Sequence, residues 1–245
     1  MRVRAAADTS SATSSDGPPR APVTVSTIVA AARELLVQGG PENVAIRELA
    51  RTLRVSAPAL YKHTSGRGEI VDLLAAACLD ELTDIVIAAR DGIPPHDHRG
   101  RFLAAGQAWY RWAHAHPAEH ALIFATPAVT FDRPTEGEAH AAGTRLGQAF
   151  QGLAVPAALA GQLRTVPDED VPIEVAAQLT QWASTRGVSL SVGQLWSTTC
   201  AFQDLMGLIM TESFGQLGYA LGRTDAYMQA RLEQLADSIT QPPGG

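Results

Sequence analysis

Helical periodicity, without any strand pattern, most constrains what this chain can fold into. Apolar residues recur three or four positions apart in one segment after another, and Gly or Pro ends each run. Alternating runs of Val, Ile and Thr at strand spacing are missing, and no internal repeat has a fixed period. The sequence therefore predicts an all-α fold. The expected helices span 24–39, 46–53, 57–63, 67–89, 98–116, 118–124, 136–154, 173–186, 192–214 and 224–239.

The size and the cysteine count narrow the class of protein. A chain of 245 residues, 46% of them hydrophobic, is long enough for one or two domains with a sizeable core. Cys78 and Cys200 cannot build a disulfide framework and fit a reducing compartment. No run reaches the roughly 18 apolar residues of a membrane-spanning helix, and no apolar segment follows Arg2 and Arg4 as in an export signal. We therefore expect a cytoplasmic protein without a membrane partner.

Charge is divided unevenly along the chain, although its total is only −6. Residues 1–20 are rich in Ser, Thr, Ala, Gly and Pro without periodicity, which is typical of a disordered arm. Residues 21–68 carry six basic and three acidic side chains, whereas residues 69–245 carry ten basic and twenty acidic ones. This asymmetry predicts a small anion-binding domain over 21–68 and a larger acidic helical domain over 69–245.

Two short helices joined by a tight turn form a candidate helix-turn-helix within residues 46–63. The second helix of such a unit can lie in the major groove of DNA, which is wide enough to admit it. Its outer face needs short or polar side chains, which Ser56, Ala57 and Pro58 supply. From spacing alone, an ordinary helical hairpin with solvated charges is equally compatible. Donors that could hold phosphates flank the outer face, namely Arg47, Tyr61, Lys62, His63 and, at the start of the next helix, Arg67.

The run from Val55 to His63, Val-Ser-Ala-Pro-Ala-Leu-Tyr-Lys-His, closely resembles the DNA-binding domain of the TetR family of transcriptional regulators. The resemblance extends from the preceding helix, with its Gly39-Gly40 end, into the helix that begins near Arg67. It implies that Ala57 and Pro58 lie against base edges. The residues that it implies in phosphate contacts are Arg47, Tyr61, Lys62, His63 and Arg67.

Two positions depart from the family pattern. Arg54 stands where the family usually has Gly in the turn between the two helices. A non-Gly residue in a left-handed turn costs about 1 kcal/mol. Thr64 replaces the usual Phe or Val after the His, which predicts looser packing beneath that turn.

The helical remainder of TetR-like proteins dimerises and holds a small-molecule pocket. Here an aromatic helix, a break at His116-Pro117 and a helix ending at Phe124 look like the C-terminal domain of a subgroup named for Trp, His and Gly on a later helix. The corresponding stretch begins at Trp196 and has Cys200 and Ala201 in place of His and Gly. The resemblance therefore implies a small hydrophobic effector and a homodimer.

Large apolar side chains on the helices expected to pack together are the candidates for the effector pocket. Pockets are typically apolar with few polar groups, but any one of these residues could equally belong to the core. The pocket candidates are Phe102, Trp109, Trp112, Phe124, Phe150, Trp196, Cys200 and Met206.

Two apolar stripes near the C-terminal end predict the dimer interface. Met228, Leu232 and Leu235 form one continuous stripe on the last helix. The stripe on the preceding helix includes Phe202 and Ile209 and is wide enough for both the core and a second subunit. A two-fold dimer would match a palindromic operator.

Other chemistries find little support in the sequence. His116 and His120 have the spacing of metal ligands, but Pro117 breaks the helix between them and no Cys is near in sequence, so no metal or cofactor is expected. Motifs of hydrolases, nucleotide-binding enzymes and β-lactamases are missing. We therefore expect a DNA-binding repressor, not an enzyme, that a small molecule releases from a palindromic double-stranded operator. The alternative is a helical small-molecule-binding protein, or an all-α enzyme, without DNA binding.

Overall fold

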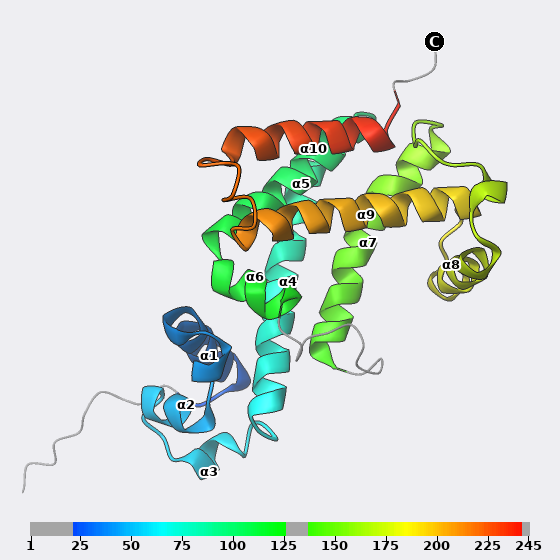
Figure 1. Cartoon of the computed structure of the whole chain (residues 1–245). Helices are drawn as coiled ribbons and strands as arrows, with labels where there is room; N and C mark the ends of the chain where they lie inside the picture. Colours follow the sequence, from blue (N-terminus) through cyan, green and yellow to red (C-terminus); the bar gives the residue numbers. More distant parts are fainter. Residues whose placement is uncertain (1–21, 126–136, 242–245) are drawn as a thin grey trace, which may run out of the picture.

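The computed structural model describes residues 22–125 and 137–241, so the arm predicted over 1–20 lies outside the described residues. Within these two ranges the chain forms helices and no β-strand (Figure 1), which confirms the all-α prediction. The only pairing of strand type there is an isolated bridge between Leu163 and Thr240. The helices are α1 (Val25–Gly39), α2 (Ile46–Thr52), α3 (Ala57–Leu60), α4 (Arg67–Asp91), α5 (His98–Ala115), α6 (Pro117–Phe124), α7 (Glu138–Leu159), α8 (Ile173–Arg186), α9 (Val192–Ser213) and α10 (Asp225–Ile239).

Local sequence signals set most of the helix boundaries. Thr24 caps α1 in a capping box with Thr27, and Ser191 caps α9 in the same way with Gln194. Gly187 ends α8 in the left-handed conformation, with a φ of 64°. These ends lie within a residue or two of the predicted ones.

Two helices end elsewhere than predicted. α7 runs through Pro156 to Leu159, because a proline so near the C-terminal end removes only one backbone donor. The buried Ala157 holds this last turn against the core. α3 is shorter than predicted because the carbonyl of Leu60 accepts the backbone N–H groups of both His63 and Thr64, which turns the chain toward α4.

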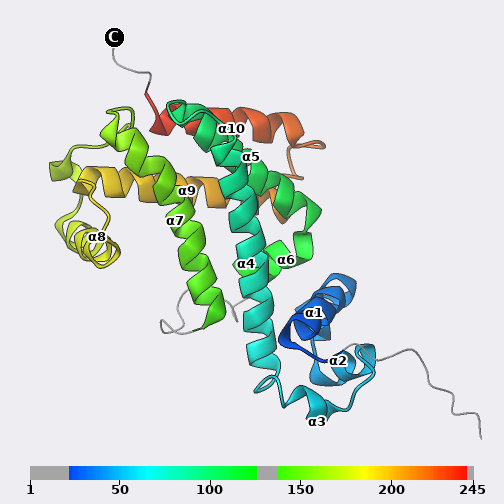
Figure 2. The same cartoon turned by 180° about the vertical axis from the view of Figure 1, so that it is seen from behind.

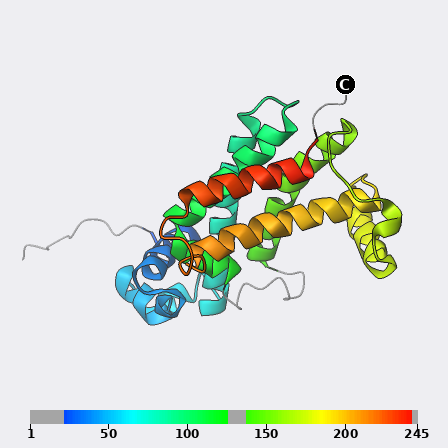
Figure 3. The same ribbon diagram turned by 45° about the horizontal axis from the view of Figure 1, so that its top comes forward.

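α4 is the central helix of the molecule. α1 packs against its N-terminal part, and α5 also packs against it (Figures 1 and 2). α7 runs beside it from Asp72, which accepts from the backbone N–H of Glu138, to Arg90, which donates to the carbonyl of Ala149. α9 and α10 lie side by side and pack on α5 (Figure 3). One core of buried residues extends from Ile28 on α1 to Ala236 on α10. The helix-turn-helix therefore meets the larger bundle through α1, which packs on α4 and α6, and through α4 itself.

Candidate functional site

α2 and α3 form a helix-turn-helix held by a small apolar core. Leu49 on α2 and Leu60 on α3 are fully buried, together with Leu36 of α1. In the turn between the helices, the backbone N–H of Val55 donates to the carbonyl of Ala50 over 2.9 Å. This bond closes the turn and sets the direction of α3.

Arg54 occupies that turn in a left-handed conformation, with a φ of 53°. It is the only non-Gly residue with positive φ in the described part of the chain. The strain that the sequence predicted at this position is therefore present, and its cost is about 1 kcal/mol.

We expect Arg54→Gly to raise the free energy of unfolding by up to about 1 kcal/mol, less the extra entropy of Gly in the unfolded chain. Arg54 is exposed, so Arg54→Ala is a matched control that removes the charge and keeps the strain. Urea unfolding measures both variants. Equal stabilities of the Gly and Ala variants would contradict the strain.

The predicted DNA contacts form an exposed surface around α3. Ser56, Pro58, Tyr61, Lys62 and His63 are exposed, as is Arg47 on α2, while Ala57 is half-buried. Within the described residues, the side chains of Arg47 and Lys62 form no ion pair or hydrogen bond. The neighbouring Arg51 is instead paired with Glu48 over 2.8 Å. Arg47 and Lys62 are therefore free to bind an external anion.

Arg67, which the sequence predicted to contact a phosphate, forms hydrogen bonds within the protein. Its Nε donates to the carbonyl of Val44 over 2.9 Å, and its Nη2 donates to the carbonyl of Pro41 over 2.7 Å. These bonds fasten the α1–α2 connection to the start of α4. Only the donors left over, chiefly Nη1, could reach a phosphate.

Thr64 makes polar contacts where the sequence predicted loose packing. Its side chain is buried, and its hydroxyl accepts from the backbone N–H of Gly66 over 3.2 Å. The carboxylate of Glu69 accepts from the backbone N–H of Ser65 over 2.5 Å, which holds the pKa of Glu69 below its usual value. A hydroxyl and a carboxylate thus organise the start of α4 in place of a bulky apolar residue.

Arg33 joins the helix-turn-helix to the larger bundle. From α1, its Nε donates to Glu119 on α6 over 2.8 Å, and its Nη1 donates to Glu81 on α4 over 2.5 Å. The Nε1 of Trp112 donates to the same Glu81 over 2.9 Å. The Arg33 guanidinium, which contributes most, and Trp112 hold the pKa of Glu81 below its usual value. We call Arg33, Glu81 and Glu119 the interdomain clamp; the sequence offered no signal for it, because its members are far apart in the chain.

His120, next to Glu119, is buried in an aromatic environment. It is fully buried, and neither ring nitrogen has a hydrogen-bond partner within residues 22–125 and 137–241. Its ring centroid lies 4.9 Å from that of Phe124 and 5.8 Å from that of Phe214. Burial lowers the pKa of His120 to about 4. The imidazole is therefore neutral in the folded protein at physiological pH.

We expect His120 to make the folded protein less stable as the pH falls from 6.5 toward 4. Within this window the unfolded chain takes up a proton that the folded one does not, at about 1.4 kcal/mol for each pH unit. Denaturation of wild type and His120→Leu should give parallel stability curves above pH 7 and a shallower decline for the variant below pH 6.5. Curves that stay parallel down to pH 5 would contradict this.

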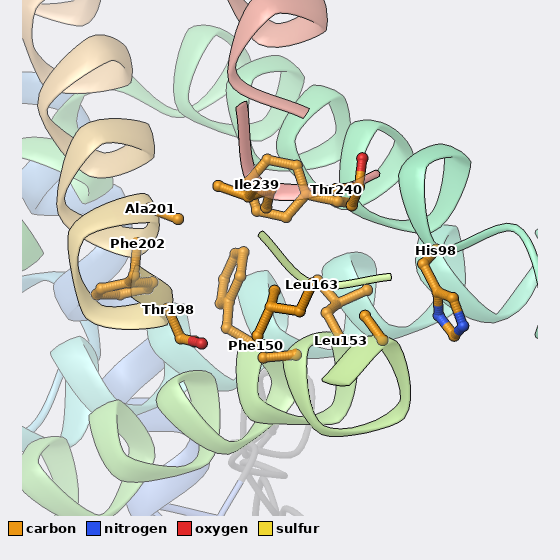
Figure 4. A pocket seen from close by; sticks show the side chains of 12 residues that line it. His98, Phe150, Leu153, Leu163, Thr198, Ala201, Phe202, Ile239 and Thr240 are labelled. Carbon is orange, nitrogen blue, oxygen red and sulfur yellow. The ribbon is translucent and has the colours of Figure 1, made fainter. Parts of the chain in front are cut away.

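Two apolar cavities lie in the larger bundle. One, of about 290 Å³, lies between α7, α8 and α9, and we call it the apolar chamber. The other, of about 30 Å³, lies between α5, α7, α9 and α10, and we call it the neck (Figure 4). The chamber is lined by Gly147, Phe150, Gln151, Leu179, Trp182, Val188, Leu190, Leu195, Thr198, Thr199 and Phe202. The neck is lined by His98, Phe102, Phe150, Leu153, Ala154, Ala157, Leu163, Thr198, Ala201, Phe202, Ile239 and Thr240.

The predicted pocket residues are only partly brought together. Phe102 lines the neck, and Phe150 lines both cavities. Trp109 is fully buried beside them, with its ring centroid 5.7 Å from that of Phe150 and 5.4 Å from that of Phe124. Trp112 is buried on the clamp. Trp196, Cys200 and Met206 are half-buried on α9 and line neither of these two cavities.

The predicted dimer residues lie mostly inside the chain. Ile209, Met228, Leu232 and Leu235 are buried within the chain, where α9 and α10 pack on α5. Phe202 lines both cavities. An amphipathic stripe shows that one face of a helix is covered but not what covers it. These side chains are covered within the chain, and their part in a dimer interface stays a prediction.

Known proteins match both parts of the chain. Residues 28–74 match the family described as "Bacterial regulatory proteins, tetR family". Residues 102–235, more than half of the chain, match the "Tetracyclin repressor-like, C-terminal domain". The chain belongs to the TetR family. The match leaves the Trp-His-Gly subgroup a prediction.

Relatives and solved structures agree with this assignment. The HTH-type transcriptional regulators Rv1816 of Mycobacterium tuberculosis and Mb1846 of Mycobacterium bovis are each 26% identical to the chain, over 78% of its length and 81% of theirs. A protein of unknown function from Rhodococcus sp. RHA1 has the same fold, with a TM-score of 0.66 at 20% identity, covering 92% of this chain and 100% of that one. A putative tetR family regulator from Shewanella sp. PV-4 has a TM-score of 0.58 at 14% identity, covering 90% and 100%.

The chain is thus a helix-turn-helix transcriptional regulator of the TetR family. Its family and its relatives indicate a role in the regulation of transcription and not in catalysis. Among the described residues, no helix is long and apolar enough to cross a membrane. In the same ranges, no three His, Cys, Asp or Glu side chains are grouped so that they could hold a metal ion.

Proposed function

We propose that this TetR regulator is a homodimeric repressor that a small molecule releases from a palindromic operator. The observation that carries the DNA-binding part is the exposed surface around α3, on which Arg47 and Lys62 have no partner among the described residues. On this proposal Lys62, Tyr61, His63 and Arg47 contact phosphates. Ser56, Ala57 and Pro58 face the bases.

The outward faces of α9 and α10 support a dimer. With the apolar stripes turned inward, the exposed residues on α9 include Gln203 and Gly207, and those on α10 include Tyr227 and Ala230. A Cβ at Gly207 would meet nothing within 4 Å. Small residues on an open helix face allow a second copy to approach closely, and a two-fold axis there would use the same surface on both subunits.

The release mechanism follows from how the clamp is placed. The ring of Trp109 contacts Phe150, which lines both cavities, and also contacts Phe124 on α6. α6 carries Glu119, which binds Arg33 of α1. An effector in the cavities would shift α6 and thereby the helix-turn-helix. The shift in operator affinity is limited by the difference in the effector's affinity for the two states.

Selection of bound DNA from a random pool by the purified chain tests the proposed function. We expect a palindrome whose half-sites are one helical turn or more apart. Enrichment of a single unrepeated half-site would refute the proposal that the chain binds DNA as a dimer. Failure to retain any duplex at low salt would refute DNA binding itself.

We expect Gly207→Arg to convert the dimer to a monomer, because it places a charge on the proposed two-fold interface. Gly222→Arg is the matched control, since Gly222 is exposed in the α9–α10 connection and also has open space at its Cβ. Sedimentation velocity measures both variants against wild type. A dimeric Gly207→Arg variant would place the interface elsewhere.

A further inference from the structure

Three cavities of the larger bundle adjoin one another, as the residues that they share show. The neck shares Phe150, Thr198 and Phe202 with the apolar chamber. It shares His98 and Thr240 with an open groove of about 650 Å³ on the surface, which we call the polar groove. Figure 4 shows His98 and Thr240 toward one side of the neck, and Thr198 and Phe202 toward the other. The three cavities therefore adjoin one another in the order polar groove, neck and chamber, and we call this row the path.

The inner part of this path accepts only uncharged groups. Among the residues that the structure describes, no Asp, Glu, Lys or Arg lines the neck or the chamber. The hydroxyl hydrogens of Thr198 and Thr199 are already donated to the backbone carbonyls of Gln194 and Leu195, each over 2.8 Å. A charged group here would lose its hydration without gaining a partner. The neck, of about 30 Å³, is the smallest of the three cavities, which favours an unbranched chain over fused rings.

The outer end of the path has a cation, Arg164, that forms no ion pair within the described residues. Asp237 lies nearby, and its pKa is lowered mainly by the hydrogen bond from Arg99 and to a smaller extent by the charge of Arg164. In the polar groove, Arg99 is paired with Asp237 over 2.6 Å, and Asp97 accepts from the backbone N–H of Gly100 over 2.8 Å. Arg164 donates its Nε to the carbonyl of Thr240 over 2.8 Å. Among the described residues, no carboxylate forms an ion pair with it. Its Nη groups are therefore available to an anion at the entrance of the path.

We propose that the polar groove, the neck and the chamber form one site for a single-tailed amphiphile, a straight-chain alkyl carboxylate. Its carboxylate binds Arg164, and its tail passes the Phe150 and Phe202 rings into the chamber. This inference rests on the proposed function, because the amphiphile would be the effector. The class of effector follows from the difference between the two ends of the path, with charged side chains in the polar groove and uncharged ones in the chamber.

Isothermal titration calorimetry tests the site. Straight-chain carboxylates of increasing length are added to the DNA-free wild-type chain, and the affinity of each is measured. Each added methylene that enters the path should tighten binding by about fourfold, up to the length that fills the chamber. Methyl esters of the same lengths should bind at least tenfold more weakly than the acids. Affinity independent of chain length, or equal for acids and esters, would overturn the proposal.

Two variants locate the ligand within the path. Arg164→Gln should weaken the acids at least tenfold and leave the esters unchanged, whereas Arg111→Gln, on the exposed face of α5, should change neither. Ala201→Leu, in the wall of the neck, should abolish the gain from longer tails. An Arg164→Gln variant that binds acids as wild type does would overturn the assignment of the head group.

A separate mobility-shift experiment distinguishes this inference from the proposed function. Carboxylate binding that leaves DNA affinity unchanged would keep the site and refute its role as the effector site. DNA binding by a chain that takes up no carboxylate would refute the site and keep the DNA-binding regulator.

Discussion

Replacing Arg33 by Met is expected to lower the free energy of unfolding at pH 7 by about 3 kcal/mol. The Glu119 carboxylate is only 3% exposed, and Arg33 is its one partner in the described structure. Removing one partner of a buried pair leaves an uncompensated charge, which typically costs about 3 to 5 kcal/mol. The lower value applies because the Arg33 side chain is 31% exposed. Urea denaturation of the purified variant measures the loss.

Two further variants separate the clamp from a general effect of losing an arginine. Arg33→Met combined with Glu119→Gln should recover part of the loss, because the buried charge is then gone as well. Arg51→Met removes an exposed pair with Glu48 and should cost less than about 1 kcal/mol. A double variant no more stable than Arg33→Met alone would show that the unpaired Glu119 is not the cause.

The clamp also makes α1 sensitive to the position of α6. Arg33 contacts carboxylates on two helices at once, Glu81 on α4 and Glu119 on α6. A movement of α6 that separates Glu119 from Arg33 would therefore be opposed by the cost of leaving Glu119 unpaired. The proposed effector must therefore bind the state with α6 shifted more tightly than the state with the clamp closed. The difference in binding free energy must exceed the cost of leaving Glu119 unpaired.

Local signals made the helices and the helix-turn-helix predictable. Capping by Thr24 and Ser191 and the stop at Gly187 act within one turn of the chain. The left-handed conformation at Arg54 followed from its position in a family turn, and it is found there. Such features depend on neighbours in sequence, which one sequence displays directly.

Features that depend on distant contacts could not be predicted in this way. Met228 and Leu232 show a helical stripe, but nothing in the sequence says whether a helix of the same chain or of a second copy covers it. The path through the bundle depends on Leu163, Thr198 and Ala201, small or ordinary residues from two segments that are far apart in sequence. The large aromatic residues were predicted because they are conspicuous in sequence, yet Trp109 is core.

Replacing Lys62 by Ala is expected to weaken operator binding roughly 10- to 100-fold near physiological salt. Lys62 is exposed beside α3 and has no internal partner in the described structure, so its ammonium is available to a phosphate. A protein that neutralises Z phosphates loses affinity with salt at a slope of about −0.9Z. A two-fold dimer presents two copies of Lys62, so the variant should lose two phosphate contacts and its salt slope should become shallower by about 2.

The salt slope therefore reports on both the contact and the assembly. A slope shallower by only about 1 would mean that one subunit binds the DNA, which contradicts the dimer even if affinity falls as expected. Arg223→Ala, which removes a 90% exposed arginine ahead of α10, is the matched control and should leave the slope unchanged. Because phosphates carry no sequence information, Lys62→Ala should weaken all duplexes alike, whereas Pro58→Ala should change the preferred sequence. An unchanged slope for Lys62→Ala would remove this residue, and the surface built around it, from the proposed DNA contacts.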